Sequence, residues 1–104
     1  MENLATEEKD YYELFKRLLK NKYTFVEKYI LAEKSELNTF QLECIKKYIK
    51  TLEKIKSLQL YFNQVKHLLS NNRTIKKLNR IEILIDKRDD YFNDLLDYQI
   101  IDLA

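Results

Sequence analysis

Neither glycine nor proline occurs anywhere in this chain of 104 residues. Glycine supplies the left-handed conformations of tight turns and phosphate-binding loops, and both residues are common in β-hairpins and other reverse turns. P-loop and dinucleotide-binding fingerprints, which require glycine at fixed positions, are therefore excluded. A chain with few means of turning sharply is suited to long helices joined by few connections, so we expect an all-α fold.

A single domain over residues 1–104 is expected, because a chain of this length with 45% hydrophobic residues can form one core without a disulfide or a metal. The only cysteine, Cys44, has no partner for an internal disulfide. The N-terminal residues lack the apolar run of a signal peptide or a membrane span. The sequence therefore predicts a cytoplasmic protein that needs no cofactor and does not act at a membrane.

From Tyr11 onwards, apolar residues recur at spacings of four and three, which is the pattern of one helix face. Thr6, followed by two glutamates, is suited to cap the start of such a helix. The pattern predicts a helix over residues 6–34. Lys22 interrupts the pattern, so a first helix broken near residues 21–24, which would make four helices in all, is the alternative.

A second helix is expected to begin at Asn38, because Asn38 and Gln41 have the spacing of a capping box. Its apolar pattern continues to the polar sequence SNNR at residues 70–73, where one of the two asparagines is expected to take a left-handed conformation. Thr74 then caps a third helix whose pattern reaches Gln99. Three long helices with short connections favour an antiparallel three-helix bundle with coiled-coil-like packing.

Charge is strongly segregated along the chain, although the formal net charge is only +2. Residues 1–43 carry a net charge of −2, residues 44–80 carry +9 and residues 81–104 carry −5. The third expected helix is basic at its N-terminal end and acidic at its C-terminal end, the reverse of what the helix dipole favours. A local rule that is broken without compensation indicates a binding surface on that helix.

Four aspartates at spacings of four, four and three form a row that we name the acidic ridge: Asp86, Asp90, Asp94 and Asp97. At about 100° per residue this row lies opposite the apolar face of its helix, so it is expected to be exposed. The antiparallel arrangement brings Lys46, Lys50 and Lys54 level with the row, but these lysines also face outward. Direct ion pairs between the two rows are therefore not expected.

The acidic ridge is not expected to be catalytic, because exposed carboxylates keep ordinary pKa values. A straight helix face also does not converge oxygen ligands on a metal ion. The ridge is therefore either a solvated face or one half of an intermolecular contact. For such a contact, the nearest apolar anchors are Tyr91, Leu96 and Tyr98.

Residues around the expected turn form a second charged surface, which we name the basic pole: Lys66, His67, Arg73, Lys76, Lys77 and Arg80. The only histidine, His67, lacks the further ligands of a zinc site and is expected on the surface. The cations suit phosphates, and Tyr61 is placed to stack on a base. A sequence pI near 8.5, only four arginines and helices too long for a compact helix-turn-helix count against nucleic acid.

The sequence ends in the apolar stretch DYQIIDLA, whereas chain termini are usually polar. The apolar side chains of this stretch are expected to pack on the first helix or on another chain. Cys44 lies on the flank of the apolar stripe of its helix and is expected to be a packed thiol, not a nucleophile.

These features favour a small non-enzymatic interaction or regulatory protein, of the kind found among regulators and adaptors of bacteria and their mobile elements. The expected partner is another protein, with a second copy of the chain as one option. A nucleic acid bound at the basic pole is the alternative.

Overall fold

The computed structural model describes residues 9–22 and 29–103, which form an all-α protein with one small sheet. The α-helices are α2 (Tyr11–Lys22), α3 (Thr39–Val65) and α4 (Asn71–Asp97), and the 3₁₀-helices are η1 (Lys34–Glu36) and η2 (Lys66–Leu68). The strands are β1 (Tyr29–Leu31) and β2 (Ile101–Leu103). The expected all-α class and helical bundle are thereby confirmed.

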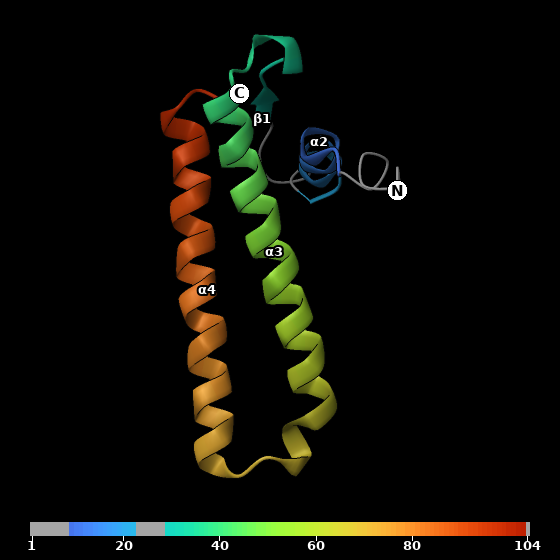
Figure 1. Cartoon of the computed structure of the whole chain (residues 1–104), viewed down its shortest axis with the longest axis vertical. Helices are drawn as coiled ribbons and strands as arrows, with labels where there is room; N and C mark the ends of the chain where they lie inside the picture. The colour runs from blue at the N-terminus through green and yellow to red at the C-terminus, as the bar shows by residue number, and fades with distance from the viewer. Residues whose placement is uncertain (1–8, 23–28, 104) are drawn as a thin grey trace, which may run out of the picture.

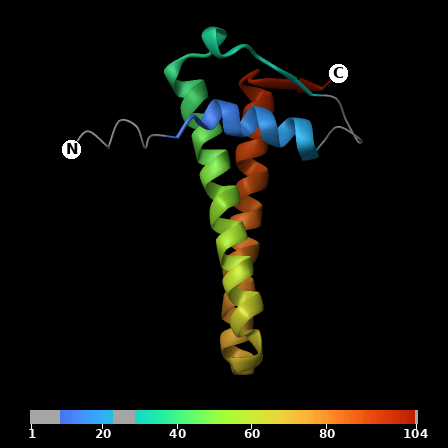
Figure 2. The same ribbon diagram turned by 90° about the vertical axis from the view of Figure 1, so that its right-hand side faces the viewer.

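Helices α3 and α4 form a long antiparallel hairpin, and α2 crosses both of them near the end where β1 and β2 lie (Figure 1 and Figure 2). Each long helix has 27 residues and is about 40 Å long at 1.5 Å per residue, whereas α2 has 12 residues. Because α2 is short and runs across the hairpin, it covers only one end of it.

The predicted helix over residues 6–34 is wrong in its extent. Helix α2 ends at Lys22, where the apolar pattern is interrupted, but no fourth α-helix follows in the described residues 29–34. Thr6, the expected cap, and residues 23–28 lie outside the described part of the chain.

Strand β1 replaces the C-terminal part of the predicted first helix because a distant segment pairs with it. β1 and β2 are antiparallel, with Ile30 opposite Asp102. The Ala32 N–H continues the pairing and donates to the Ile100 carbonyl at 3.0 Å. β-Branched and aromatic residues suit a strand as well as a helix face, so tertiary pairing decides the outcome.

Asp10 caps the N-terminus of α2. Its Oδ1 accepts a hydrogen bond from the Glu13 N–H at 3.2 Å, and its Oδ2 accepts one from Lys34 Nζ at 3.3 Å. The hydrogen bond from the Glu13 backbone, helped by the Lys34 ammonium, holds the pKa of Asp10 below its ordinary value. Asp10 therefore both caps the start of α2 and links it to η1 through Lys34.

Replacing Asp10 with alanine is expected to lower the free energy of unfolding by about 1 kcal/mol, since a capping acceptor is lost. Asp10→Asn should keep the cap but lose the charge. Because the folded-state pKa of Asp10 is depressed, its charge stabilises the fold above the ordinary pKa of about 4 and ceases to do so as the pH falls through the folded value. In urea unfolding, the wild type should therefore exceed the Asp10→Asn variant in stability by more at pH 7 than at pH 2.5; an equal difference at both pH values would contradict the assignment.

The connection between α3 and α4 differs from the predicted one. Asn38 caps α3 as expected, accepting from the Gln41 N–H at 2.8 Å within a capping box. At the other end, η2 follows α3 directly, and Ser70, not Thr74, caps α4. The two asparagines of the sequence SNNR lie in the first turn of α4, because a 3₁₀ turn followed by an extended residue reverses the chain without a left-handed residue.

The left-handed conformation occurs instead at Gln99, whose φ of 60° is the only positive value in the described residues. Gln99 was predicted to lie in the third helix, but α4 ends at Asp97. The Gln99 N–H donates to the Leu96 carbonyl at 3.1 Å, and the Ile100 N–H donates to the Leu95 carbonyl at 2.9 Å. These two hydrogen bonds form the Schellman motif of a helix C-terminus. Its left-handed position, here taken by Gln99, is usually occupied by glycine.

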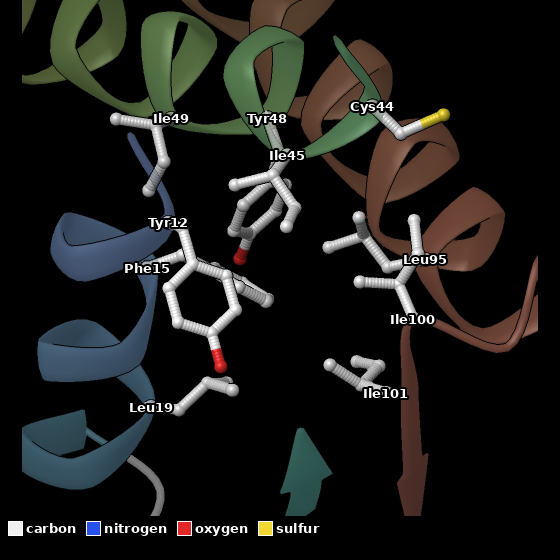
Figure 3. Close-up of a cluster of buried hydrophobic side chains, with 10 residues drawn as sticks. All are labelled: Tyr12, Phe15, Leu19, Cys44, Ile45, Tyr48, Ile49, Leu95, Ile100 and Ile101. Carbon is white, nitrogen blue, oxygen red and sulfur yellow. The ribbon is translucent and has the colours of Figure 1, made fainter. Parts of the chain in front are cut away.

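The packed core lies between α2, the adjoining ends of α3 and α4, and β2 (Figure 3). Phe15 is fully buried and meets Tyr48 edge-on, with ring centroids 5.6 Å apart. Tyr12 is more deeply buried than Tyr11, which the apolar pattern favoured, because α2 lies across two helices. The core consists of Tyr12, Phe15, Leu19, Cys44, Ile45, Tyr48, Ile49, Leu95, Ile100 and Ile101.

The C-terminal segment is buried as the sequence predicted, within its own chain. Ile100 is fully buried and Ile101 is 2% exposed, and both belong to the same core as Phe15 of α2.

Beyond this core the hairpin continues as two helices alone, a part that we name the distal arm (residues 54–81). Only Ile55 and Ile81 are buried in it. The apolar pattern placed Leu78 inward, but its side chain is 47% exposed. The reason is that no third helix in the described part of the chain runs along this half of the hairpin (Figure 2).

Candidate functional site

Part of the basic pole lines one open hollow of about 370 Å³ on the distal arm, which we name the cationic hollow. Its wall consists of Tyr61, Leu69, Arg73, Lys76, Lys77 and Arg80. The remaining two residues of the basic pole, Lys66 and His67, lie in η2, are exposed as expected and do not line the hollow.

Two helices build the cationic hollow. Helix α4 supplies its cations at positions three, four and seven residues after Arg73, which places them on one side of the helix. Helix α3 supplies Tyr61, and Lys77 Nζ lies 5.0 Å from the centre of that ring in a cation–π contact. The hollow therefore combines an aromatic wall with cations that suit a carboxylate or a phosphate.

The electrostatic potential around the cationic hollow is positive, because no nearby acidic side chain in the described part of the chain neutralises its cations. Residues 54–81 contain seven lysines and arginines and no aspartate or glutamate. The salt bridges within the described residues are Lys9–Glu53, Lys34–Asp10 and Arg88–Asp89, so none involves a cation of the hollow. The N-terminal end of α4 adds the positive end of its dipole. An acidic ligand is favoured here, and salt will weaken its attraction.

Large apolar side chains are also exposed elsewhere on the distal arm, although among them only Tyr61 lines the cationic hollow. Those between 47% and 75% exposed are Leu60, Tyr61, Leu68, Ile75 and Leu78. A second hollow, of about 300 Å³, is lined by Gln59, Phe62, Asn63, Leu78 and Ile81.

Sequence reasoning missed this apolar surface because it placed Phe62 and Leu78 inward in a bundle whose first helix, expected over residues 6–34, was as long as the other two. A signal was present in Leu60 and Leu68, since both lie outside the main apolar stripe and so indicate a second apolar face.

The acidic ridge lies on the outer side of α4, towards the end of the hairpin that holds the core. Asp86, Asp90 and Asp97 are exposed and Asp94 is half-buried. None of the four pairs with Lys46, Lys50 or Lys54 in the described residues, so the predicted absence of an ion-pair ladder is confirmed there.

The three expected anchors beside the acidic ridge differ in exposure. Tyr91 and Leu96 pack partly against the core. Tyr98 is 45% exposed and meets the exposed ring of Phe40 edge-on, with ring centroids 4.9 Å apart. The Tyr98 carbonyl accepts a hydrogen bond from Gln41 Nε2 at 2.9 Å, which holds this end of α4 against the start of α3.

Cys44 is buried at the edge of the core, and burial raises the pKa of its thiol. It is therefore the packed thiol that the sequence predicted. In the described residues no group of three or more histidine, cysteine, aspartate or glutamate side chains is placed to hold a metal ion. No helix in this part of the chain is long and apolar enough to cross a membrane.

Comparison of the chain with protein-family models, with curated proteins and with solved structures gives no match.

Proposed function

We propose that this chain is a non-enzymatic interaction protein, a regulator or adaptor that binds another protein through its distal arm. The observation that supports this most directly is the exposure of five large apolar side chains on the arm, while the packed core occupies the opposite end of the hairpin. Several large exposed apolar side chains near charged residues are typical of protein-binding surfaces.

The charge of the arm defines the chemistry of the partner. A protein partner with exposed carboxylates would place them at the cationic hollow, and its apolar side chains would cover exposed leucines of the arm such as Leu60 and Leu78. We propose a cytoplasmic location, which the lone, buried Cys44 supports, because the fold has no internal disulfide that depends on an oxidising compartment.

The proposal is tested by capture from lysate with two matched double variants. Leu60→Ser with Leu78→Ser alters the arm, and Ile30→Ser with Phe40→Ser alters equally exposed apolar residues at the other end of the molecule. We expect the arm variant to lose roughly thirty- to thousand-fold in partner affinity, because each of the two truncated anchors costs about 1–2 kcal/mol at an interface. The other variant should bind like the wild type; the opposite pattern would overturn the site.

Nucleic acid is the second candidate partner. It is supported by the four cations that line the same hollow as the exposed ring of Tyr61. The contact of Lys77 with that ring counts against it, because a base could stack only after displacing the lysine. Capture repeated with nuclease separates the two candidates. Loss of the captured partner after nuclease treatment, together with a steep fall in affinity as salt rises, would favour nucleic acid.

A further inference from the structure

A second regular stripe, which we name the outer stripe, runs along the exposed side of α4, the orange helix of Figure 1. Starting at Arg73, its positions follow alternating spacings of three and four residues up to Asp97, which is the spacing of a coiled-coil seam. Of the positions in this outer stripe, all are exposed except the half-buried Asp94. None of them forms a salt bridge within the described residues.

The outer stripe is divided by charge into two halves. Its N-terminal half consists of Arg73, Lys76 and Arg80, and its C-terminal half consists of Asp90, Asp94 and Asp97. Between the halves lie Ile83, which is 57% exposed, and Lys87. The stripe thus presents three cations, a short central segment and three carboxylates in one row.

These two halves are mirror images in their spacing. Arg80 and Asp90 lie five residues on either side of Ile85, Lys76 and Asp94 lie nine, and Arg73 and Asp97 lie twelve. Ile83 and Lys87 lie two residues on either side of it. A second α4 that runs antiparallel about this centre would therefore bring each of Arg73, Lys76 and Arg80 opposite a carboxylate, and Lys87 opposite Ile83.

We propose that the chain forms a two-fold homodimer through the outer stripe of α4. The two copies of α4 run antiparallel, and the two-fold axis passes at the level of residue 85, midway along the stripe. Each copy contributes three cations and three carboxylates, so the two-fold axis generates six ion pairs. The alkyl stem of Lys87 covers the exposed Ile83 of the second copy near the axis. A parallel arrangement is disfavoured because it would bring like charges together.

This inference rests on the proposed function and deepens it, because it names a second copy of the chain as one protein partner, bound in part by the three cations Arg73, Lys76 and Arg80 that also line the cationic hollow. It accounts for the reversed charge of α4, which opposes the helix dipole in the isolated chain and is complemented in the dimer. It is tested on the purified chain alone, so its failure leaves the capture of a different protein by the distal arm untouched.

The test reverses the charges of each half of the outer stripe. One triple variant, Arg73→Glu with Lys76→Glu and Arg80→Glu, makes the stripe acidic, and another, Asp90→Lys with Asp94→Lys and Asp97→Lys, makes it basic. Analytical ultracentrifugation at about 50 mM salt, where screening is weak, is expected to show dimers for the wild type and monomers for each triple variant. An equimolar mixture of the two variants should form a heterodimer, and the chain with all six changes should again form a homodimer.

A control with the same change in net charge is Lys46→Glu with Lys50→Glu and Lys54→Glu on α3, which should remain dimeric. Circular dichroism verifies that each variant is folded. A wild type that is monomeric at this low salt and at about 500 μM protein, far above the dissociation constant of a specific dimer, would overturn the proposal. The proposal would also be overturned if the variant with all six charge reversals is folded but stays monomeric under conditions where the wild type is a dimer.

Orientation is tested by cross-linking. In a Cys44→Ser background, Ile83→Cys with Lys87→Cys should give disulfides that join position 83 of one copy to position 87 of the other. Disulfides that join identical positions would show a parallel pair and contradict the antiparallel arrangement.

Discussion

Replacing Phe15 with alanine is expected to lower the free energy of unfolding by about 3–5 kcal/mol. The Phe15 side chain is fully buried between α2 and α3 and meets Tyr48 edge-on. Removing it leaves a cavity and deletes the central contact that holds a helix of 12 residues across the hairpin. Because small domains have only about 5–15 kcal/mol of net stability, a large part of the total would be lost.

Urea unfolding monitored by circular dichroism measures this change. The control is Leu68→Ala, which removes a side chain that is 75% exposed in η2 and should change stability by no more than about 0.5 kcal/mol. Equal effects of the two substitutions would mean that α2 does not dock through Phe15.

Replacing Ile100 with alanine is expected to cost about 2–5 kcal/mol. Its side chain is fully buried, its N–H closes the C-terminal end of α4, and its carbonyl accepts from Ala32 beside β1. Ile30→Ala is the control, because Ile30 lies in the same small sheet but its side chain is 60% exposed. The control should cost far less.

Phe15 and Ile100 belong to one core although they come from opposite ends of the described chain. The double variant of Phe15→Ala and Ile100→Ala should therefore depart from additivity by about 0.5–3 kcal/mol in a double-mutant cycle. Strict additivity would show that the two side chains stabilise separate parts of the molecule.

The sequence predicted the two long helices well because each carries its own signals. The capping box of Asn38 and Gln41 starts α3, and both helices keep a regular apolar pattern over 27 residues. The first helix was overextended because the apolar pattern of residues 29–31 suits a helix face and a strand alike. Only pairing with residues 101–103, which no local pattern shows, makes that segment a strand.

The charged surfaces were predictable for a different reason. Helical periodicity alone places the acidic ridge on the outside, and the structure agrees for Asp86, Asp90 and Asp97, whereas Asp94 is half-buried. The apolar surface of the distal arm was not predictable in the same way. It depends on where α2 ends and in which direction it crosses the hairpin, and both depend on contacts between distant segments.

The position of the core at one end of the hairpin implies that the chain does not open as a single unit. Residues 54–81 are held by helical hydrogen bonds and little buried surface, so the arm can fray and re-form at a low free-energy cost while the core stays closed. A partner that binds the arm would suppress this local opening. Binding would then reduce the motion of the arm and leave the average structure of the core almost unchanged.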